Sequence, residues 1–292
     1  MADLATTASV LKENYLPLIK GRQTLLLALT GVAGYLCQPP DPVDWWVFIS
    51  LLGSLLLTIS GCTVLNMLID RDIDCQMERT RHRPLAEGRV RPWSAVWLGA
   101  SMLMLGFLFA AVLSLPYLMV ILAGALLNVV VYTFWLKRRT AWSILWGGVA
   151  GGMPILAGHV LAIGRVDLLG VLLALIIVCW IPSHNLTLSM LYSEDYYQAG
   201  VPTVLNMYGE KVSRLVVALS CLTVSLIMVI VFYRLGLDGF SMAMLFILSL
   251  GLIGLAIGSW AGTTPKLLSI LYKYSSLYLL VSTVLLVLSG VS

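Results

Sequence analysis

Long runs without charged residues constrain the fold of this chain of 292 residues more than any other feature. Nine such runs are long enough, as helices, to cross about 30 Å of hydrocarbon, where only helices and closed barrels satisfy the peptide groups. With 60% apolar and 11% charged residues, the chain has too little polar surface for a water-soluble globule. We therefore predict an all-α, polytopic membrane helix bundle. The expected spans are residues 23–38, 45–68, 93–113, 116–136, 141–163, 168–191, 215–233, 242–260 and 274–291.

The basic residues are distributed unevenly between the two predicted sides of the bundle. With the N-terminus in the cytoplasm, sixteen of the eighteen Lys and Arg residues fall on the cytoplasmic side, and Arg165 and Arg234 fall on the other. The positive-inside rule predicts such an asymmetry. We therefore expect a cytoplasmic N-terminus, an outer C-terminus, and cytoplasmic cap loops after the second and sixth helices, at about residues 69–92 and 192–214. The chain is expected to form a single transmembrane domain over residues 1–292.

Charge and cysteine content narrow the functional classes further. The net charge of +4 is too small to indicate a nucleic-acid partner. The five cysteines lie in apolar segments without C-x-x-C spacing, so we expect neither a disulfide nor a metal site from them. Residues 1–22 resemble neither a signal peptide nor a transit peptide, which favours a prokaryotic cytoplasmic (inner) membrane.

A polar face is predicted at the inner end of the second helix. Asn66, Asp70 and Asp74 follow one another at four-residue spacing, which stacks them on one side of a helix, while Asp72 points away. Clustered carboxylates repel each other unless a cation joins them. Oxygen ligands at the edge of a membrane suit Mg²⁺, which commonly shares its coordination sphere with substrate phosphates. The sequence therefore predicts a magnesium site here.

Arginines follow this face directly, at Arg79, Arg81 and Arg83. Guanidinium groups bind phosphate bidentately, so carboxylates for Mg²⁺ beside arginines for phosphate, at the edge of an apolar bundle, indicate a diphosphate carrying a long hydrocarbon. An isoprenyl diphosphate meets both demands. The alternative interpretation is that the arginines only set membrane orientation and that the carboxylates lie in a solvated loop.

These motifs resemble those of the UbiA-type intramembrane prenyltransferases. The likeness runs from about residue 15 to the C-terminus, and the Arg-Thr-Arg-His-Arg-Pro-Leu form is similar to the branch that farnesylates haem. The segments that carry the resemblance are Asn66-x-x-x-Asp70-x-x-x-Asp74, Arg79 to Leu85, Tyr132 to Thr140, Gly147 to Gly152 and Glu194 to Pro202.

The resemblance implies Mg²⁺-dependent transfer of a farnesyl group from farnesyl diphosphate to the vinyl group of haem B, which is a substrate. Partners would be the lipid bilayer and, as further candidates, a second copy of the chain, a haem A synthase or a terminal oxidase. The implied metal ligands are Asn66, Asp70, Asp74, Glu194 and Asp195, of which Asn66, Asp70, Asp74 and Asp195 are expected to be catalytic, and the implied diphosphate ligands are Arg79, Arg81, Arg83, Lys137, Arg138 and Lys211.

The acceptor stays open between haem B and another aromatic or lipid molecule such as a quinone precursor. The segment Ser183-His-Asn-Leu186 replaces the Pro-His-Phe-Trp that is usual in the haem branch. His184 is a candidate haem ligand or base, or an ordinary hydrogen-bonded histidine, and Tyr196 is a candidate substrate contact or interfacial anchor. His159 is expected to serve packing or to be exposed at the outer interface, and not to contact haem. A third hypothesis is a non-enzymatic haem or lipid carrier.

Overall fold

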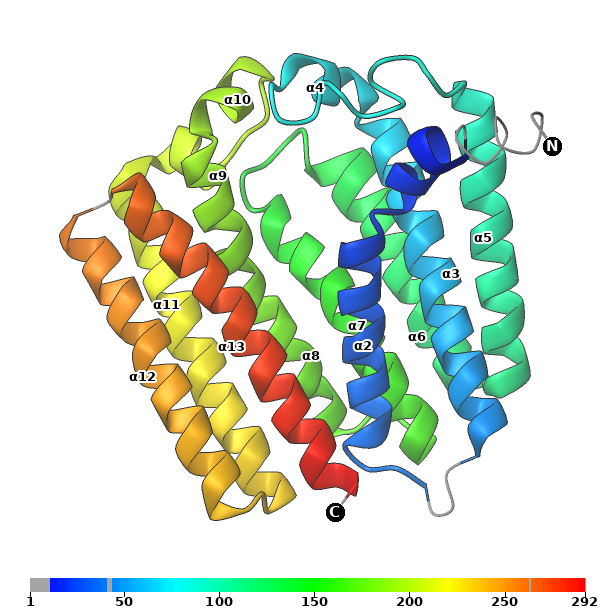
Figure 1. Cartoon of the computed structure of the whole chain (residues 1–292), viewed down its shortest axis with the longest axis vertical. Coiled ribbons are helices and arrows are strands. Elements are labelled where there is room, and N and C mark those ends of the chain that lie inside the picture. Colours follow the sequence, from blue (N-terminus) through cyan, green and yellow to red (C-terminus); the bar gives the residue numbers. More distant parts are fainter. Residues whose placement is uncertain (1–10, 41–43, 263, 292) are drawn as a thin grey trace.

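The long helices of the chain lie side by side and form a single bundle (Figure 1). The computed structural model describes residues 11–40, 44–262 and 264–291, and within these ranges all regular secondary structure is helical. Two short helices, α4 (Arg71–Gln76) and α10 (Ser193–Gln198), lie together at one end of the bundle. The prediction of an all-α polytopic membrane protein is confirmed.

Eight helical segments among the described residues are long and apolar enough to cross a membrane. A further helix, α2 (Gly21–Leu36), has 16 residues and packs against α3 and α7, so the exact count of nine spans stays a prediction. The eight segments are α3 (Trp45–Ile69), α5 (Pro92–Leu113), α6 (Leu115–Leu126) with η3 (Leu127–Leu136), α7 (Ser143–Ile163), α8 (Leu168–Ile181) with η4 (Pro182–Leu186) and α9 (Thr187–Leu191), α11 (Val204–Leu235), α12 (Gly239–Ala261) and α13 (Pro265–Val291).

Two helices begin well before the spans expected from the sequence. α11 starts at Val204, where residue 215 was expected, and Gly209, with φ of 80° and ψ of 177°, kinks this added part. α13 starts at Pro265, where residue 274 was expected. The reason is physical, because a run without charges marks the hydrocarbon layer and not the end of a helix. The extra turns carry charged residues, which can remain helical outside the hydrocarbon.

Side chains cap several helices and explain polar residues that carry no chemistry. At the end of the bundle opposite α4 and α10, Asp44, Asp167 and Asp238 accept hydrogen bonds from backbone amides in the first turns of α3, α8 and α12. Ser114 does the same for α6, which confirms a turn between the third and fourth expected spans. An N-cap of this kind typically contributes about 1 kcal/mol.

Close contact between α2 and α7 depends on residues without side chains. Gly34 of α2 lies against the backbone of Ile155, and Gly158 of α7 lies against the carbonyl oxygen of Gly31. Small residues of this kind let membrane helices approach each other closely. The contact fixes α2 beside α7, and both helices line the cavity described below.

We expect Gly158→Ala to destabilise the protein by about 1–3 kcal/mol, because the added methyl group would overlap the Gly31 carbonyl oxygen. Gly254→Ala is the matched control, since a methyl group on this helical glycine of α12 would meet nothing within 4 Å. Thermal unfolding of the two purified variants in detergent measures the difference. Equal melting temperatures of the two variants would show that α2 and α7 accommodate the added methyl group without a loss of stability.

Candidate active site

A cavity of about 650 Å³ lies inside the bundle, at the end where α4 and α10 lie and extending into the apolar interior. Its deeper wall is mainly apolar and includes Leu55, Ile121, Met153, Ile177 and Leu279. The wall near α4 is polar and strongly charged. The charged and amide side chains there include Lys20, Asn66, Asp70, Arg79, Arg83, Asn128, Lys137 and Asn185.

Asp70 lies at the junction between α3 and α4 and is almost fully buried, with 1% of its surface exposed. The ammonium group of Lys137 donates a hydrogen bond to its Oδ2 atom. Its Oδ1 atom is buried and has no hydrogen-bond partner in the described chain. A buried, unpaired carboxylate oxygen is costly, so this atom is suited to receive a cation.

Asn66 presents its side-chain oxygen to the same space. Its Nδ2 atom donates to Thr133 Oγ1 at 2.8 Å, which orients the amide, and its Oδ1 atom accepts from Lys20 Nζ at 3.2 Å. Lys20 adopts a left-handed backbone conformation with φ of 46°, which is rare outside glycine and often occurs at functional sites. Burial, together with the positive charges of Arg83 and Lys137, lowers the pKa of Lys20 to about 8.

Asp74 keeps the predicted four-residue spacing but is engaged elsewhere. The backbone hydrogen bonds run from Asp70 to Asn66 at 3.0 Å and from Asp74 to Asp70 at 2.8 Å, so the turn continues through the junction. Both carboxylate oxygens of Asp74 accept from Nη1 of Arg83, at 2.8 and 2.7 Å. Asn66 and Asp70 line the cavity, whereas Asp74 lies behind Arg83.

The six basic residues expected to bind diphosphate separate into two groups. Arg79, Arg83 and Lys137 line the cavity. The other three lie at the protein surface: Arg81 pairs with Glu78, Arg138 forms a two-pronged ion pair with Asp72 at 2.7 Å, and Lys211 is exposed on α11.

The second acidic segment approaches the first through the backbone. Asp195 Oδ2 accepts from the backbone amide of Arg79 at 3.3 Å, which ties α10 to the arginine loop, and the neighbouring Tyr196 lines the cavity. Glu194 is exposed and accepts from Gln198 at 2.9 Å. Across the described ranges, no cluster of three or more His, Cys, Asp and Glu side chains could hold a metal by itself. An ion here would need amide and ligand oxygens as well.

The three histidines lie in different surroundings. His184 lines the cavity, between the rings of Trp180 and Tyr272. His159 is fully buried, and its Nε2 atom lies 2.9 Å from Asp167 Oδ1 near the opposite end of the bundle, in agreement with a packing role. His82 is exposed beside Glu87.

Sequence reasoning missed several residues of the cavity wall, including Lys20, Asn128 and Asn185, and did not single out Tyr132 as a site residue. Two π-helical segments, η3 and η4, carry Asn128, Tyr132, His184 and Asn185. Such segments are frequent at functional sites. A basic residue just before the first apolar run was the available signal for Lys20.

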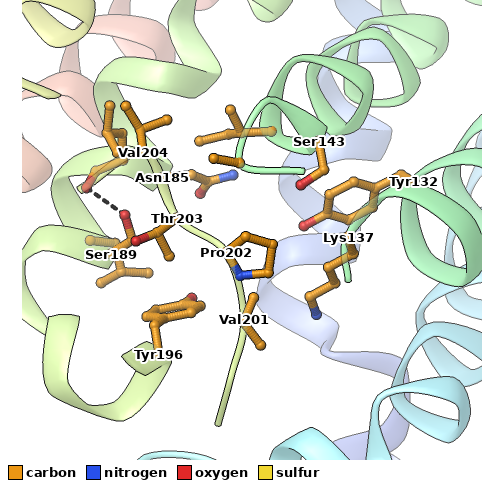
Figure 2. Close-up of a pocket in the computed structure, with 14 residues that line it drawn as sticks. Tyr132, Lys137, Ser143, Asn185, Ser189, Tyr196, Val201, Pro202, Thr203 and Val204 are labelled. Carbon is orange, nitrogen blue, oxygen red and sulfur yellow. Dashed lines mark hydrogen bonds between the residues drawn. The ribbon is translucent and has the colours of Figure 1, made fainter. Parts of the chain in front are cut away.

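A smaller pocket of about 200 Å³ adjoins the main cavity and shares part of its wall. Figure 2 shows Tyr132 and Lys137 on one side of it and Tyr196, Val201 and Pro202 on the other. The shared residues include Tyr132, Lys137, Asn185 and Tyr196. The charged end of the site therefore lies between η3 and the segment that follows α10.

Comparison with known proteins places these features in a family context. The sequence profile of the UbiA prenyltransferase family matches residues 27–288. A protoheme IX farnesyltransferase from Thermofilum pendens is 42% identical over 228 residues, covering 77% of this chain and 79% of that protein. One from Desulforudis audaxviator is 35% identical over 288 residues, covering 91% and 85%.

Solved structures share the fold at low sequence identity. A digeranylgeranylglyceryl phosphate synthase structure superposes with a TM-score of 0.80 at 18% identity, covering 97% of this chain and 99% of that one. A UbiA homologue from Archaeoglobus fulgidus bound to DMAPP and Mg²⁺ superposes with a TM-score of 0.68 at 15% identity, covering 94% and 99%.

We expect Lys137→Gln to weaken binding of inorganic diphosphate, in the presence of Mg²⁺, by about ten- to a hundredfold, because a hydrogen bond to a charged group contributes about 1.5–3 kcal/mol. Arg138→Gln is the matched control, since the neighbouring residue pairs with Asp72 at the surface. Calorimetric titration of the detergent-purified variants with diphosphate and Mg²⁺ measures the two affinities. Equal losses in the two variants would contradict the division between cavity and surface.

Proposed function

Because this chain belongs to the UbiA prenyltransferase family and is a membrane-embedded prenyltransferase, we propose that it transfers the farnesyl group of farnesyl diphosphate to the vinyl group of haem B, giving haem O and diphosphate. One observation carries the proposal: a buried carboxylate with an orphaned oxygen stands among lysines and arginines at the charged end of a long apolar cavity. The relatives named protoheme IX farnesyltransferase support the choice of donor and acceptor.

The residues present fit Mg²⁺. Asp70 Oδ1 and Asn66 Oδ1 are hard oxygen donors on the cavity wall, and diphosphate oxygens and water would complete an octahedral set. Asp74 joins them in this proposal once Arg83 turns from it towards the diphosphate. Glu194 and Asp195 stay candidates for a second ion or for a bridge to a lysine. When bound, Mg²⁺ neutralises the charge that develops on the departing diphosphate.

The chain's own cations assist the same step. Lys137, Arg83, Arg79 and Lys20 surround the place where the diphosphate would lie. As the allylic C–O bond breaks, both electrons leave with the diphosphate oxygen. Hydrogen bonds from ammonium and guanidinium groups strengthen as that charge grows, and each good contact of this kind contributes about 3 kcal/mol to the transition state.

The apolar depth of the cavity would hold the farnesyl chain and protect the cation. Side chains such as Leu55, Ile121 and Met153 exclude water without offering an oxygen or nitrogen that could capture an allylic cation. The vinyl π electrons of the acceptor then form the new C–C bond, which leaves a cation on the other vinyl carbon. A water molecule admitted at this last step adds to that cation and loses a proton, which gives the hydroxyl group of haem O. The allylic cation needs surroundings that limit the access of water, and the apolar wall of the cavity provides them.

We place the charged end of the cavity at the cytoplasmic face of a prokaryotic inner membrane, with the whole chain acting as one prenyltransferase domain. The uneven distribution of basic residues supports this orientation. Association with a second copy, a haem A synthase or a terminal oxidase remains a prediction from the sequence.

The assay uses membranes with labelled farnesyl diphosphate and either haem B or an aromatic quinone precursor. We expect a labelled product with haem B that depends on Mg²⁺. Asp70→Asn should lower its rate by about a hundredfold or more, whereas Asp72→Asn, which alters a carboxylate paired with Arg138 at the surface, should stay near the wild-type rate.

Two results would redirect the proposal. A product formed only with the quinone precursor would replace haem B by another aromatic acceptor. Ligand binding that survives in Asp70→Asn, without any prenyl transfer by the wild type, would indicate a haem or lipid carrier.

A further inference from the structure

The imidazole ring of His184 is held rigidly in the cavity wall. It stacks on Trp180 at 4.5 Å between ring centroids and 20° between planes, and on Tyr272 at 4.2 Å and 23°. Trp180 is itself fixed, because its indole N–H donates to the carbonyl oxygen of Ser275 at 2.8 Å. With both faces covered, only the edge of the ring remains available to a ligand.

The hydrogen bonds around the ring decide which nitrogen carries the proton. His184 Nδ1 lies 3.3 Å from Ser275 Oγ and 3.2 Å from Ser276 Oγ. Each serine hydroxyl is also placed to donate to the carbonyl oxygen of Tyr272, at 2.9 and 3.1 Å. With the hydroxyl protons directed to Tyr272, the serine oxygens accept from the ring, and on this basis we assign the proton to Nδ1 and the lone pair to Nε2.

The lone pair of Nε2 is directed away from the serines of α13, and the ring lines the cavity. Both side-chain hydrogen bonds of the ring use Nδ1, so no side chain of the described chain is bonded to Nε2. The ring also forms a hydrogen bond with the backbone of Tyr272. Histidines that bind metals typically donate the other ring N–H to a neighbouring acceptor, which fixes tautomer and orientation. His184 shows this arrangement, although the residues that the structure describes form no cluster of metal ligands around it.

We propose that His184 Nε2 coordinates the iron of a metalloporphyrin acceptor and so positions it against the farnesyl cation. This inference rests on the proposed function, since it concerns the acceptor of that reaction. A porphyrin supplies four nitrogen ligands to its metal and needs one axial ligand from the protein, which matches a lone imidazole. The charged residues near α4 are then free to hold the diphosphate, and the acceptor is held by a neutral group.

The test titrates the purified full-length protein with Fe(III) protoporphyrin IX and, separately, with metal-free protoporphyrin IX. The wild type should bind the iron form at least about tenfold more tightly, with an absorption spectrum typical of an imidazole ligand. His184→Phe should bind both porphyrins alike, since phenylalanine keeps the aromatic stack and removes the ligand atom. Replacing Ser275 and Ser276 by Ala should weaken iron-porphyrin binding by about tenfold.

His82→Ala is the control, because His82 is an exposed histidine of the arginine loop, and it should retain the full preference for iron. A wild type without that preference, or a His184→Phe variant that keeps it, would overturn the inference. If His184→Phe does not fold, the preference of the wild type for the iron porphyrin and its absorption spectrum still test whether a histidine coordinates the iron. Prenyl transfer to haem B, measured in parallel, keeps the two proposals separate: transfer without an iron preference refutes only the coordination.

Discussion

The buried carboxylate of Asp70, in contact with Lys137 and carrying one oxygen without a partner, is the interaction on which the arrangement of the site depends. Ionised groups at membrane depth are costly and persist where they serve a function. The cluster around Asp70 contains more ammonium and guanidinium groups than carboxylates. The excess positive charge of this cluster favours the binding of an anion. The unpaired oxygen of Asp70 favours the binding of a cation. A metal-bound diphosphate would satisfy both requirements at once.

The remaining architecture keeps this cluster at one end of the helix bundle. Glycine contacts bring α2 and α7 together, and the aspartate caps Asp44, Asp167 and Asp238 lie at the opposite end, so the acidic groups there are already engaged with backbone amides. The apolar interior between the two ends offers space for a hydrocarbon chain and few groups that could react with a cation. The fold thus separates the charged end of the cavity, which suits a diphosphate, from the apolar interior, which suits a hydrocarbon chain.

The sequence was sufficient to predict the membrane bundle, because uncharged runs report directly on burial in hydrocarbon. It also pointed to Asn66 and Asp70, since four-residue spacing places side chains on one helix face, but the same spacing did not bring Asp74 to the cavity. It could not show that Arg138 pairs with Asp72 or that Arg83 pairs with Asp74, because those partners depend on how loops fold back. Nor could it reveal the π-helical segments η3 and η4, because one extra residue in a turn changes neither composition nor hydropathy.

A histidine lone pair in this cavity poses a chemical problem that its coordination would solve. An allylic cation formed nearby would alkylate a free imidazole nitrogen, since neutral imidazole is a good nucleophile. Iron coordination engages the lone pair of Nε2 and removes that side reaction. The acceptor would then have to bind before farnesyl diphosphate ionises, which orders the two substrates. The same serine contacts that fix the tautomer of His184 would therefore contribute both to placing the acceptor and to protecting the enzyme from its own intermediate.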